Sequence, residues 1–585
     1  QTQDMSRTAR DVSTRSERQV TTGRELSDAV LKLTAAIDEI RKAQSVLRQG
    51  DAAISEEMAE VREDAQRVVH SGDALGRAVE QLTHEAETLE AEVFRFKLPQ
   101  ARPGGTLQVG LHRNVTIDET RGFDPLFTVD LQISELSGSL FSTLVRYEDG
   151  ALVPDLAEAW EADPTGRRYR LSLRKGVTFA DGVSFTAGHV KAHFERLLSP
   201  ASAAPDAVLF KDITGAPDYL RGETRSVQGI EVLDERTIEF RLDEPRAFFL
   251  RTLALPATGI TRAEGGRVLG TGPSRMVSAS STQVTLERNP SYYAPGLPLL
   301  AKLDFRLYAT RRSALEAFTR GEVQLVSYLH AENLRELGLD PSLSLTVNTP
   351  SVWFLAFHAR AAPFDDIRVR RAIRAGLDVR GLVDTFHLGA RVARSLTPPS
   401  LLEVDRVHEP RSDVSLSRRL LAEAGHSRLR LTLHYPPDRD TREEDKVLFR
   451  PLVDAGLVEL VHVESRDFWD RVREGRLGIY RGNWIADVAD PDNFLHLLLN
   501  SKAQSYWPVG HTNGEFDRLT DEARVTVDPG LREQLYRKAE GLVREDCVMV
   551  PLYHERFHAV AGPELQGLRL HQTPPQVRFE DIWLG

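Results

Sequence analysis

Cysteine and long apolar runs are both scarce in this chain of 585 residues. The single cysteine, Cys547, has no partner for an internal disulfide, so cysteine usage does not indicate the redox compartment. No stretch approaches the roughly 18 consecutive apolar residues of a membrane-spanning helix. The net charge of -11 disfavours nucleic acid as a partner, because phosphate binding needs a surplus of lysine and arginine. The chain begins with Gln1, which leaves open an upstream signal peptide, anchor or further domain.

Proline and tryptophan are absent from residues 1–98, whereas all 30 prolines and all six tryptophans lie at or after Pro99. The only aromatic residues before that point are Phe94 and Phe96. A single core stops growing at roughly 250–300 residues, so a chain of this length should hold more than one domain. We therefore expect a domain boundary here, with residues 99–103 as a short linker.

The first part of the chain carries a heptad pattern. Apolar or small residues recur at gaps that alternate three and four, from Val30 to Phe96, with Asp51 as the one charged residue on the seam. This spacing predicts a long left-handed α-helical coiled coil. Such a helix cannot bury its apolar stripe alone, so we expect a homodimer, a larger assembly or an antiparallel partner segment.

The stretch "LTHEAETLEAEVFRFKLP" resembles the carboxy-terminal helix of bacterial methyl-accepting chemoreceptor signalling domains. The resemblance covers residues 1–98, but the hairpin tip by which that family contacts its kinase is not in this sequence. Glu56 and Glu57 resemble the glutamate pairs that chemoreceptors methylate. The alternative is an ordinary charge pair on a solvated helix face.

From Gly104 onward, short strand and helix patterns alternate. "GTLQVGL" and "RTIEFRL" predict strands, and "VSFTAGHVKAHFERLL" predicts a helix that starts near Thr186. "DIRVRRAIRAGL" predicts a helix capped by Asp365 or Asp366. The glycines of "GTGP" should let the backbone pass close to another element, with Gly272 tolerating positive φ. The pattern predicts a mixed α/β domain.

Five blocks of this region occur in one order, and together they resemble the family 5 extracellular solute-binding proteins. That family comprises the peptide- and nickel-binding components of ABC importers. The blocks are "LVPDLAEAWEADPTGRRYRLSLRKGVTFADGVSFTAGHV", "LGTGPSRM" with "LERNPSYYAPGLPLLAKLDFRLY", "APFDDIRVRRAIRAGLD", "NWIADVADPDNFL" and "LREQLYRKAEGLVREDCVMVPLY".

The resemblance implies a two-lobed clamshell of the periplasmic-binding-protein type with an extra subdomain. It covers residues 104–585, with lobe I at about 104–345 and 550–585 and lobe II at about 355–545. Crossovers between the lobes are expected near "SVWFLAF" and "VMVPLYH".

In peptide-binding members, the aspartate of the Trp-x-x-Asp motif pairs with the ligand's α-amino group. The matching residues here are Trp484 and Asp487. A buried ammonium is tolerated only beside a carboxylate, and an indole face adds cation–π attraction. We expect Phe123 and Trp507 as further pocket walls, with core packing as the alternative for both.

Nearby, Asp490 and Asp492 flank Pro491 before a helical run, so we expect them mainly to cap it. The alternative for Asp487 is the same capping role, with Trp484 in the core.

The segment "HERFH", His554 to His558, matches the H-E-x-x-H zinc-protease motif. It follows an apolar, β-branched run that predicts a strand, and four residues of strand span about 13 Å, too far for one metal ion. We therefore predict no enzyme, no metal and no cofactor, and keep a zinc metalloprotease only as a remote alternative.

The combined features suggest a ligand-binding protein that closes two lobes around a peptide or similar small solute. Its chemoreceptor-like helix favours a cytoplasmic sensor or signalling fusion, with a chemoreceptor array as partner. The alternative is an exported substrate-binding component of a peptide ABC importer, periplasmic or membrane-anchored, with an ABC permease as partner.

Overall fold

The computed structural model describes Lys32 and residues 104–585, apart from 113–122, 128–129, 149, 266, 341–343, 405–409, 438 and 504–506. The chain separates into two units, Gln1–Gln100 and Ala101–Gly585. The expected coiled coil and the candidate methylation sites Glu56 and Glu57 lie outside the described residues. Within the described residues, no helix combines the length and apolar character needed to cross a membrane.

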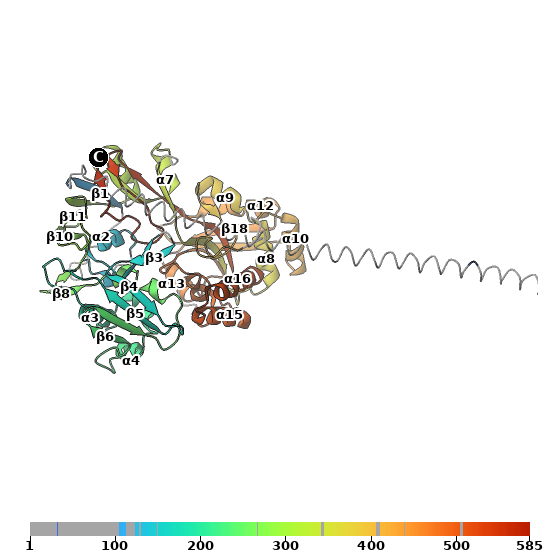
Figure 1. Ribbon diagram of the computed structural model, residues 1–585. Helices are drawn as coiled ribbons and strands as arrows, with labels where there is room; N and C mark the ends of the chain where they lie inside the picture. The colour runs from blue at the N-terminus through green and yellow to red at the C-terminus, as the bar shows by residue number, and fades with distance from the viewer. Residues whose placement is uncertain are drawn as a thin grey trace, which may run out of the picture. The chain divides into compact units, whose positions relative to one another are not determined.

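The largest sheet of the second unit has seven strands in the order β10-β11-β12-β1-β13-β21-β14 (Figure 1). Strand β1 pairs in parallel with both β12 and β13, and its residues Leu107, Val109 and Leu111 are buried. Helix α2 packs Leu136 and Leu140 against this same core. The elements are β1 (Thr106–His112), β10 (Ser274–Ala279), β11 (Gln283–Arg288), β12 (Lys302–Tyr308), β13 (Leu325–Leu329), β14 (Leu345–Asn348), β21 (Arg556–Ala561), α2 (Ile133–Leu140), α6 (Arg311–Thr319) and α7 (Ala331–Glu336).

A second sheet has four antiparallel strands in the order β16-β20-β15-β19. Its strands are β15 (Ser351–Phe357), β16 (Arg391–Val392), β19 (Ile479–Ile485) and β20 (Met549–His554). The chain passes from the first sheet to this one between β14 and β15, and returns between β20 and β21. These are the segments at which the sequence predicts the two crossovers.

Helices and a parallel strand pair surround the second sheet. In Figure 1, α8, α10, α15 and α16 lie on the opposite side of this unit from β1 and β10. The elements are α8 (Ile367–Gly376), α9 (Val379–Phe386), α10 (Val414–Glu423), β17 (Leu429–Tyr435), α11 (Arg442–Leu448), α12 (Arg450–Asp454), β18 (Val458–Glu464), α13 (Phe468–Arg473), η6 (Pro491–Asn493), α14 (Leu495–Leu499), α15 (Gly514–Val525) and α16 (Pro529–Asp546).

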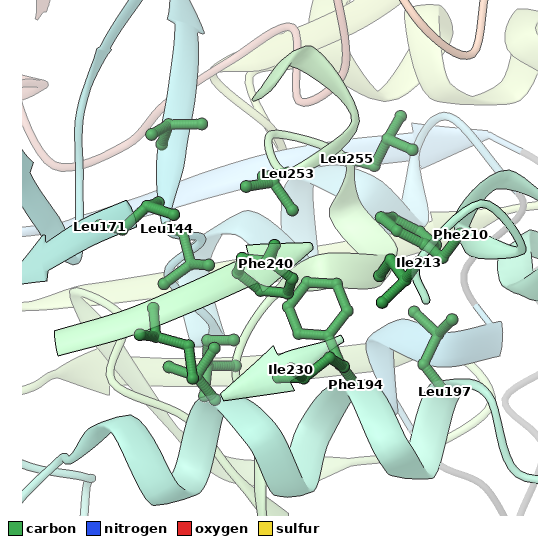
Figure 2. Packing of buried hydrophobic residues seen from close by; sticks show 14 of the residues in the cluster. Leu144, Leu171, Phe194, Leu197, Phe210, Ile213, Ile230, Phe240, Leu253 and Leu255 are labelled. Carbon is green, nitrogen blue, oxygen red and sulfur yellow. The ribbon is translucent and has the colours of Figure 1, made fainter. Parts of the chain in front are cut away.

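A third sheet, β4-β5-β7-β6, is covered by helix α3. Alternate residues of β5 are buried, as expected for a strand with one face on a core. Figure 2 shows Phe194 of α3 against Phe240 of β7, with ring centroids 5.1 Å apart. The elements are η2 (Pro125–Phe127), β4 (Ala157–Ala162), β5 (Arg168–Leu173), α3 (Ala187–Leu197), η3 (Pro205–Phe210), α4 (Ala216–Leu220), β6 (Ile230–Asp234), β7 (Thr237–Arg241), α5 (Phe249–Thr252) and η4 (Pro256–Thr258), with the hairpins β2 (Val145–Glu148)–β3 (Ala151–Pro154), β8 (Arg262–Glu264)–β9 (Arg267–Leu269) and β22 (Leu565–Gln566)–β23 (Trp583–Leu584).

Local signals in the sequence account for several of these boundaries. Helix α3 begins directly after Thr186, which forms a capping box with His189. Helix α8 follows Asp366, whose side chain accepts a hydrogen bond from the Arg368 N–H. The predicted strands at β1 and β7 are also confirmed.

The "GTGP" segment passes close to the end of α2, as expected. At Gly272 this close approach depends on the absence of a side chain. Its N–H donates to the Leu140 carbonyl at 3.0 Å, and a Cβ at this position would lie 2.4 Å from the Leu140 carbonyl carbon. Gly272 does not use its tolerance of positive φ, because it is not among the glycines in the left-handed region. Glycine is needed here for space and not for backbone conformation.

We expect Gly272→Ala to lower the free energy of unfolding by about 1–3 kcal/mol, because the added methyl must displace backbone atoms. Gly541→Ala in α16 is the matched control. Beyond its own helix, no atom of the described residues lies within 4 Å of the position that the new methyl would take, and removing a helix-interior glycine should stabilise the protein by up to about 1 kcal/mol. Urea denaturation of both variants checks the opposite signs.

Candidate functional site

A cavity of about 340 Å³ lies between the end of β19 and segments that pack on the cores of the other two sheets. One wall is the end of β19 and the loop after it, residues 483–489. The start of α2 and the α5–η4 segment form further walls, together with η3 and residues 573–574. Asp487 and Trp484 both line this cavity, so the structure brings the two predicted ligand-binding residues together.

The loop that carries Asp487 is anchored in two different hydrophobic cores. Ala486 is buried in the core of the four-stranded sheet, whereas Val488 is buried in the core of the β4-β5-β7-β6 sheet. Asp487, between these two anchors, is not buried in either core. Its side chain is accessible from the cavity.

Asn493 of η6 fixes both predicted ligand-binding residues. Its Oδ1 accepts a hydrogen bond from the Trp484 Nε1–H at 2.8 Å and another from the Asp487 N–H at 3.1 Å. One buried side chain thus sets the indole and the carboxylate relative to each other. Sequence reasoning missed Asn493, since an asparagine beside a capping aspartate has no distinctive spacing.

The Asp487 carboxylate is poorly compensated. Loss of water around the carboxylate, and to a lesser extent the negative charge of Asp206, together raise the pKa of Asp487 to about 7. Within the described part of the chain, the Asp487 carboxylate has no hydrogen-bond donor and no ion-pair partner. A cationic group that enters the cavity would supply the missing countercharge.

The arginine that lines the cavity is already engaged. Arg251 of α5 donates from Nη1 to Asp490 Oδ2 at 2.6 Å and to the Ala489 carbonyl at 3.1 Å. Asp490 is fully buried and also receives two hydrogen bonds from Arg532, at 2.6 and 2.9 Å. The Arg251 charge is therefore committed to Asp490 and does not neutralise Asp487.

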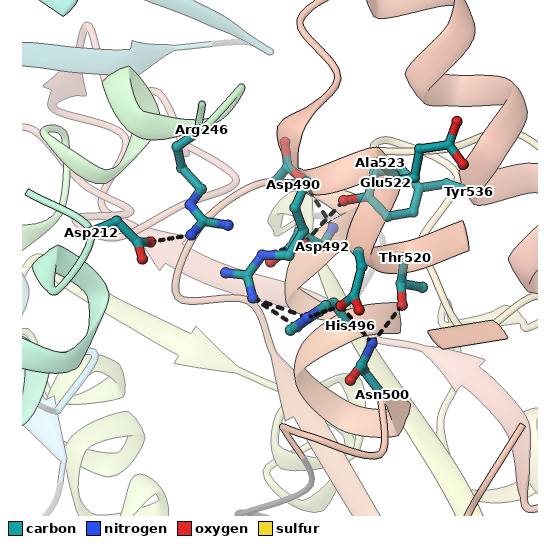
Figure 3. Close-up of polar contacts among 12 residues, drawn as sticks. Asp212, Arg246, Asp490, Asp492, His496, Asn500, Thr520, Glu522, Ala523 and Tyr536 are labelled. Carbon is teal, nitrogen blue, oxygen red and sulfur yellow. Dashed lines mark hydrogen bonds and ion pairs between the residues drawn. The ribbon is translucent and has the colours of Figure 1, made fainter. Parts of the chain in front are cut away.

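Asp490 caps η6, as predicted, because its Oδ1 accepts the Asp492 N–H at 3.0 Å. Figure 3 shows the two aspartates beside Tyr536, whose hydroxyl donates to Asp492 at 3.1 Å. Burial alone would raise the pKa of Asp490, but the Arg532 and Arg251 guanidinium groups outweigh it and hold that pKa below its usual value. These ion pairs were not predicted, since they join residues far apart in the sequence.

Phe123 and Trp507 do not line this cavity. Phe123 is 7% exposed and packs in the core of the seven-stranded sheet. Trp507 is 6% exposed, meets Phe354 edge to face and stacks on Tyr480. Both side chains occupy core positions, which is the alternative considered for them.

The "HERFH" segment is extended, as the sequence indicates. His554 ends β20 and His558 lies in β21. His554 Nδ1 lies 2.8 Å from the Ser351 carbonyl and His558 Nδ1 lies 2.7 Å from Ser344 Oγ, so each of these ring nitrogens has a structural partner. In the portion of the chain that the structure describes, no group of three or more His, Cys, Asp or Glu side chains could hold a metal ion.

The family model described as bacterial extracellular solute-binding proteins, family 5 middle, matches residues 151–506. Among curated proteins, the probable deoxycholate-binding periplasmic protein YgiS of Escherichia coli (strain K12) is 26% identical over 528 residues, covering 84% of this chain and 97% of YgiS. Di/tripeptide-binding protein 1 of Pseudomonas aeruginosa (strain UCBPP-PA14) is 26% identical over 483 residues, covering 75% of this chain and 87% of that protein. The periplasmic oligopeptide-binding protein OppA of Escherichia coli (strain K12) is 25% identical over 476 residues, covering 74% and 85%.

Solved structures share the fold. The clavulanic acid biosynthesis oligopeptide binding protein 2 superimposes with a TM-score of 0.72 at 24% identity, covering 83% of this chain and 96% of that one. The unliganded open form of the periplasmic murein tripeptide binding protein MppA gives a TM-score of 0.70 at 20% identity, covering 82% and 97%. The chain therefore has the mixed α/β fold of the periplasmic-binding-protein type that these structures share.

The chain belongs to the bacterial extracellular solute-binding proteins, family 5. This is a binding family, so the prediction that the protein is not an enzyme is confirmed. The expected cytoplasmic location is wrong, because the matching relatives are periplasmic binding proteins of an extracellular family. The resemblance of residues 1–98 to a chemoreceptor finds no support in these matches.

We expect Asp490→Asn to lower the free energy of unfolding by about 3–5 kcal/mol, because it leaves two arginines without their buried carboxylate. Since the folded-state pKa of Asp490 is depressed, its stabilisation is present above the unfolded-state pKa of about 4 and is lost as the pH falls through the folded-state value. The difference between the two proteins in chemical denaturation should therefore shrink in acid.

Asp218→Asn is the matched control for this change. Asp218 pairs with Arg221 on an exposed surface, where such pairs contribute about 0–1 kcal/mol. Equal losses in the two variants would contradict a special role for the Asp490 network.

Proposed function

We propose that this protein is the solute-binding component of an ABC importer and captures a peptide or similar small solute by its cationic amino end. The observation that carries the proposal is the Asp487 carboxylate, which is unpaired within the described residues and open to the cavity. Trp484 beside it offers an indole face and helps to exclude water. An ABC permease is the expected partner.

The relatives are named for different ligands. The charge of the cavity favours some of these ligand classes over others. Two are named for di/tripeptides or oligopeptides, and one is named for deoxycholate. An anionic ligand would face Asp487 and Asp206 with no free arginine among the lining residues described, because Arg251 is paired with Asp490. A ligand with an ammonium group would gain a charge-assisted contact there. The acidic cavity therefore favours the peptide class.

Ligand binding in such a fold is expected to shift an open-to-closed equilibrium. The cavity is lined by β19 and the loop after it and, from another part of the chain, by η3 and α5, so a solute that fills it lies against all of these segments. Contacts made on both sides stabilise the closed arrangement only when the ligand is present. The relatives support a role as an importer component. They provide no support for a role as a sensor or signalling fusion.

The central test is Asp487→Asn. We expect it to weaken binding of the tripeptide Ala-Ala-Ala by about 2–5 kcal/mol, because the ammonium loses the carboxylate with which it pairs once ligand covers the site. Isothermal titration calorimetry with Ala-Ala-Ala measures this, and N-acetylated Ala-Ala-Ala should bind the wild-type protein weakly for the same reason. Unchanged affinity in the variant would exclude Asp487 as the ammonium site.

The stability of this variant provides a control on folding. Because the folded-state pKa of Asp487 is raised, its charged form is less stable in the folded protein than in the unfolded chain near neutral pH. Asp487→Asn should therefore leave the melting temperature unchanged or raise it, in contrast to Asp490→Asn.

The affinity for Ala-Ala-Ala should depend on pH. The pKa of Asp487 is about 7 and that of Asp206 is about 6 in the ligand-free protein, and only the anionic carboxylate pairs with an ammonium. Binding below pH 7 must therefore expel a proton, and affinity should fall by up to about tenfold for each pH unit below the pKa. Titrations between pH 5 and 8, in buffers of different ionisation enthalpy, would detect the released proton. A flat profile would contradict the proposed contact.

A further inference from the structure

A second carboxylate faces the same cavity from a distant part of the chain. Asp206 lies in η3, and its charge contributes to the raised pKa of Asp487. The short helix is held by Ala207 and Phe210, which are buried in the core of the β4-β5-β7-β6 sheet. Asp206 therefore presents its side chain from a fixed support.

The charge of Asp206 has no evident structural role among the described residues. The N-cap position of η3 is Ala204 and not Asp206. Within the described residues, the Asp206 carboxylate has no hydrogen-bond donor and no ion-pair partner, and burial raises its pKa to about 6. An unpaired, partly desolvated carboxylate destabilises a folded protein, so stability of the fold does not explain why an aspartate stands at this position.

The other charged groups of the cavity are committed to the fold. Arg251 is paired with Asp490, as described above. Asp130, a third lining carboxylate, accepts the Gln132 N–H at 2.8 Å at the start of α2. Asp206 and Asp487 thus remain as two facing carboxylates, and one ligand ammonium would neutralise only one of them.

We propose that Asp206 is a second cation-binding residue, and that the cavity selects a peptide whose first residue is lysine or arginine. The α-ammonium would pair with Asp487 and the side-chain cation of the same residue with Asp206. This rests on the proposed function. The cavity volume of about 340 Å³ is at the lower end of small-ligand pockets, which suits one long side chain with its terminal ammonium.

The test compares two peptides that differ in one charge, Lys-Ala-Ala and its Nε-acetyl-lysine analogue. We expect the wild-type protein to bind Lys-Ala-Ala about ten- to a hundredfold more tightly, as expected for one charge-assisted contact. Asp206→Asn should reduce this preference to near unity while leaving affinity for the acetylated peptide unchanged or improved. Calorimetry measures all four affinities.

Two further variants keep the result interpretable. Asp206→Glu retains the charge and should retain a preference for Lys-Ala-Ala, which a purely steric role would not predict. Asp218→Asn removes an exposed carboxylate from α4, outside the residues that line the cavity, and should leave the preference unchanged. Since Asp206 has no partner to lose among the described residues, the melting temperature of Asp206→Asn should not fall.

The outcomes separate the two proposals. If the wild-type protein binds both peptides equally, or if Asp206→Asn keeps the full preference, the second cation site is rejected while peptide binding stands. If the wild-type protein binds neither peptide nor Ala-Ala-Ala, the proposed function itself is rejected.

Discussion

The saturated ion pair at Asp490 is the interaction on which the site depends. Arg251 comes from α5, which packs with the β4-β5-β7-β6 sheet, whereas Asp490 follows the β19 strand of the four-stranded sheet. A fully buried carboxylate is tolerated only with such compensation. The pair thus holds the loop after β19 between two cores. Because Asp490 neutralises the charge of Arg251, this arginine is not available to pair with a ligand in the cavity.

The neighbouring Asp487 differs for a geometric reason. Ala486 and Val488 are each buried in a different core, so the residue between them is directed into the space that separates those cores. Three positions apart along the chain, one aspartate is neutralised by two guanidinium groups and the other has no countercharge among the described residues. The loop therefore concentrates its stabilising contacts at one residue and exposes a poorly compensated charge at the other. A binding protein needs this division, because a carboxylate already paired within the fold has little to gain from a ligand.

Local structure followed from the sequence where the signal was local. One helix starts directly after Thr186, as expected, Asp366 caps the next predicted helix, and the run before His554 is a strand. The close approach at "GTGP" was also predictable, since two glycines beside a proline suggest contact with another backbone. The direction of that contact, onto the Leu140 carbonyl, was not predictable, and Gly272 does not adopt the positive φ that it could tolerate.

The sequence alone determined the family, the α/β character and the choice of Asp487 as a candidate, because ordered motifs and periodic apolar residues are properties of contiguous segments. Only the tertiary structure brought Asp206, Arg251 and Asn493 to the same place. Their roles depend on which charges meet across the cavity, and electrostatic energy depends on distance in space and on exclusion of water, neither of which the order of residues records. The sequence could name a carboxylate suited to holding a ligand, but the surrounding fold decided that no described residue neutralises it.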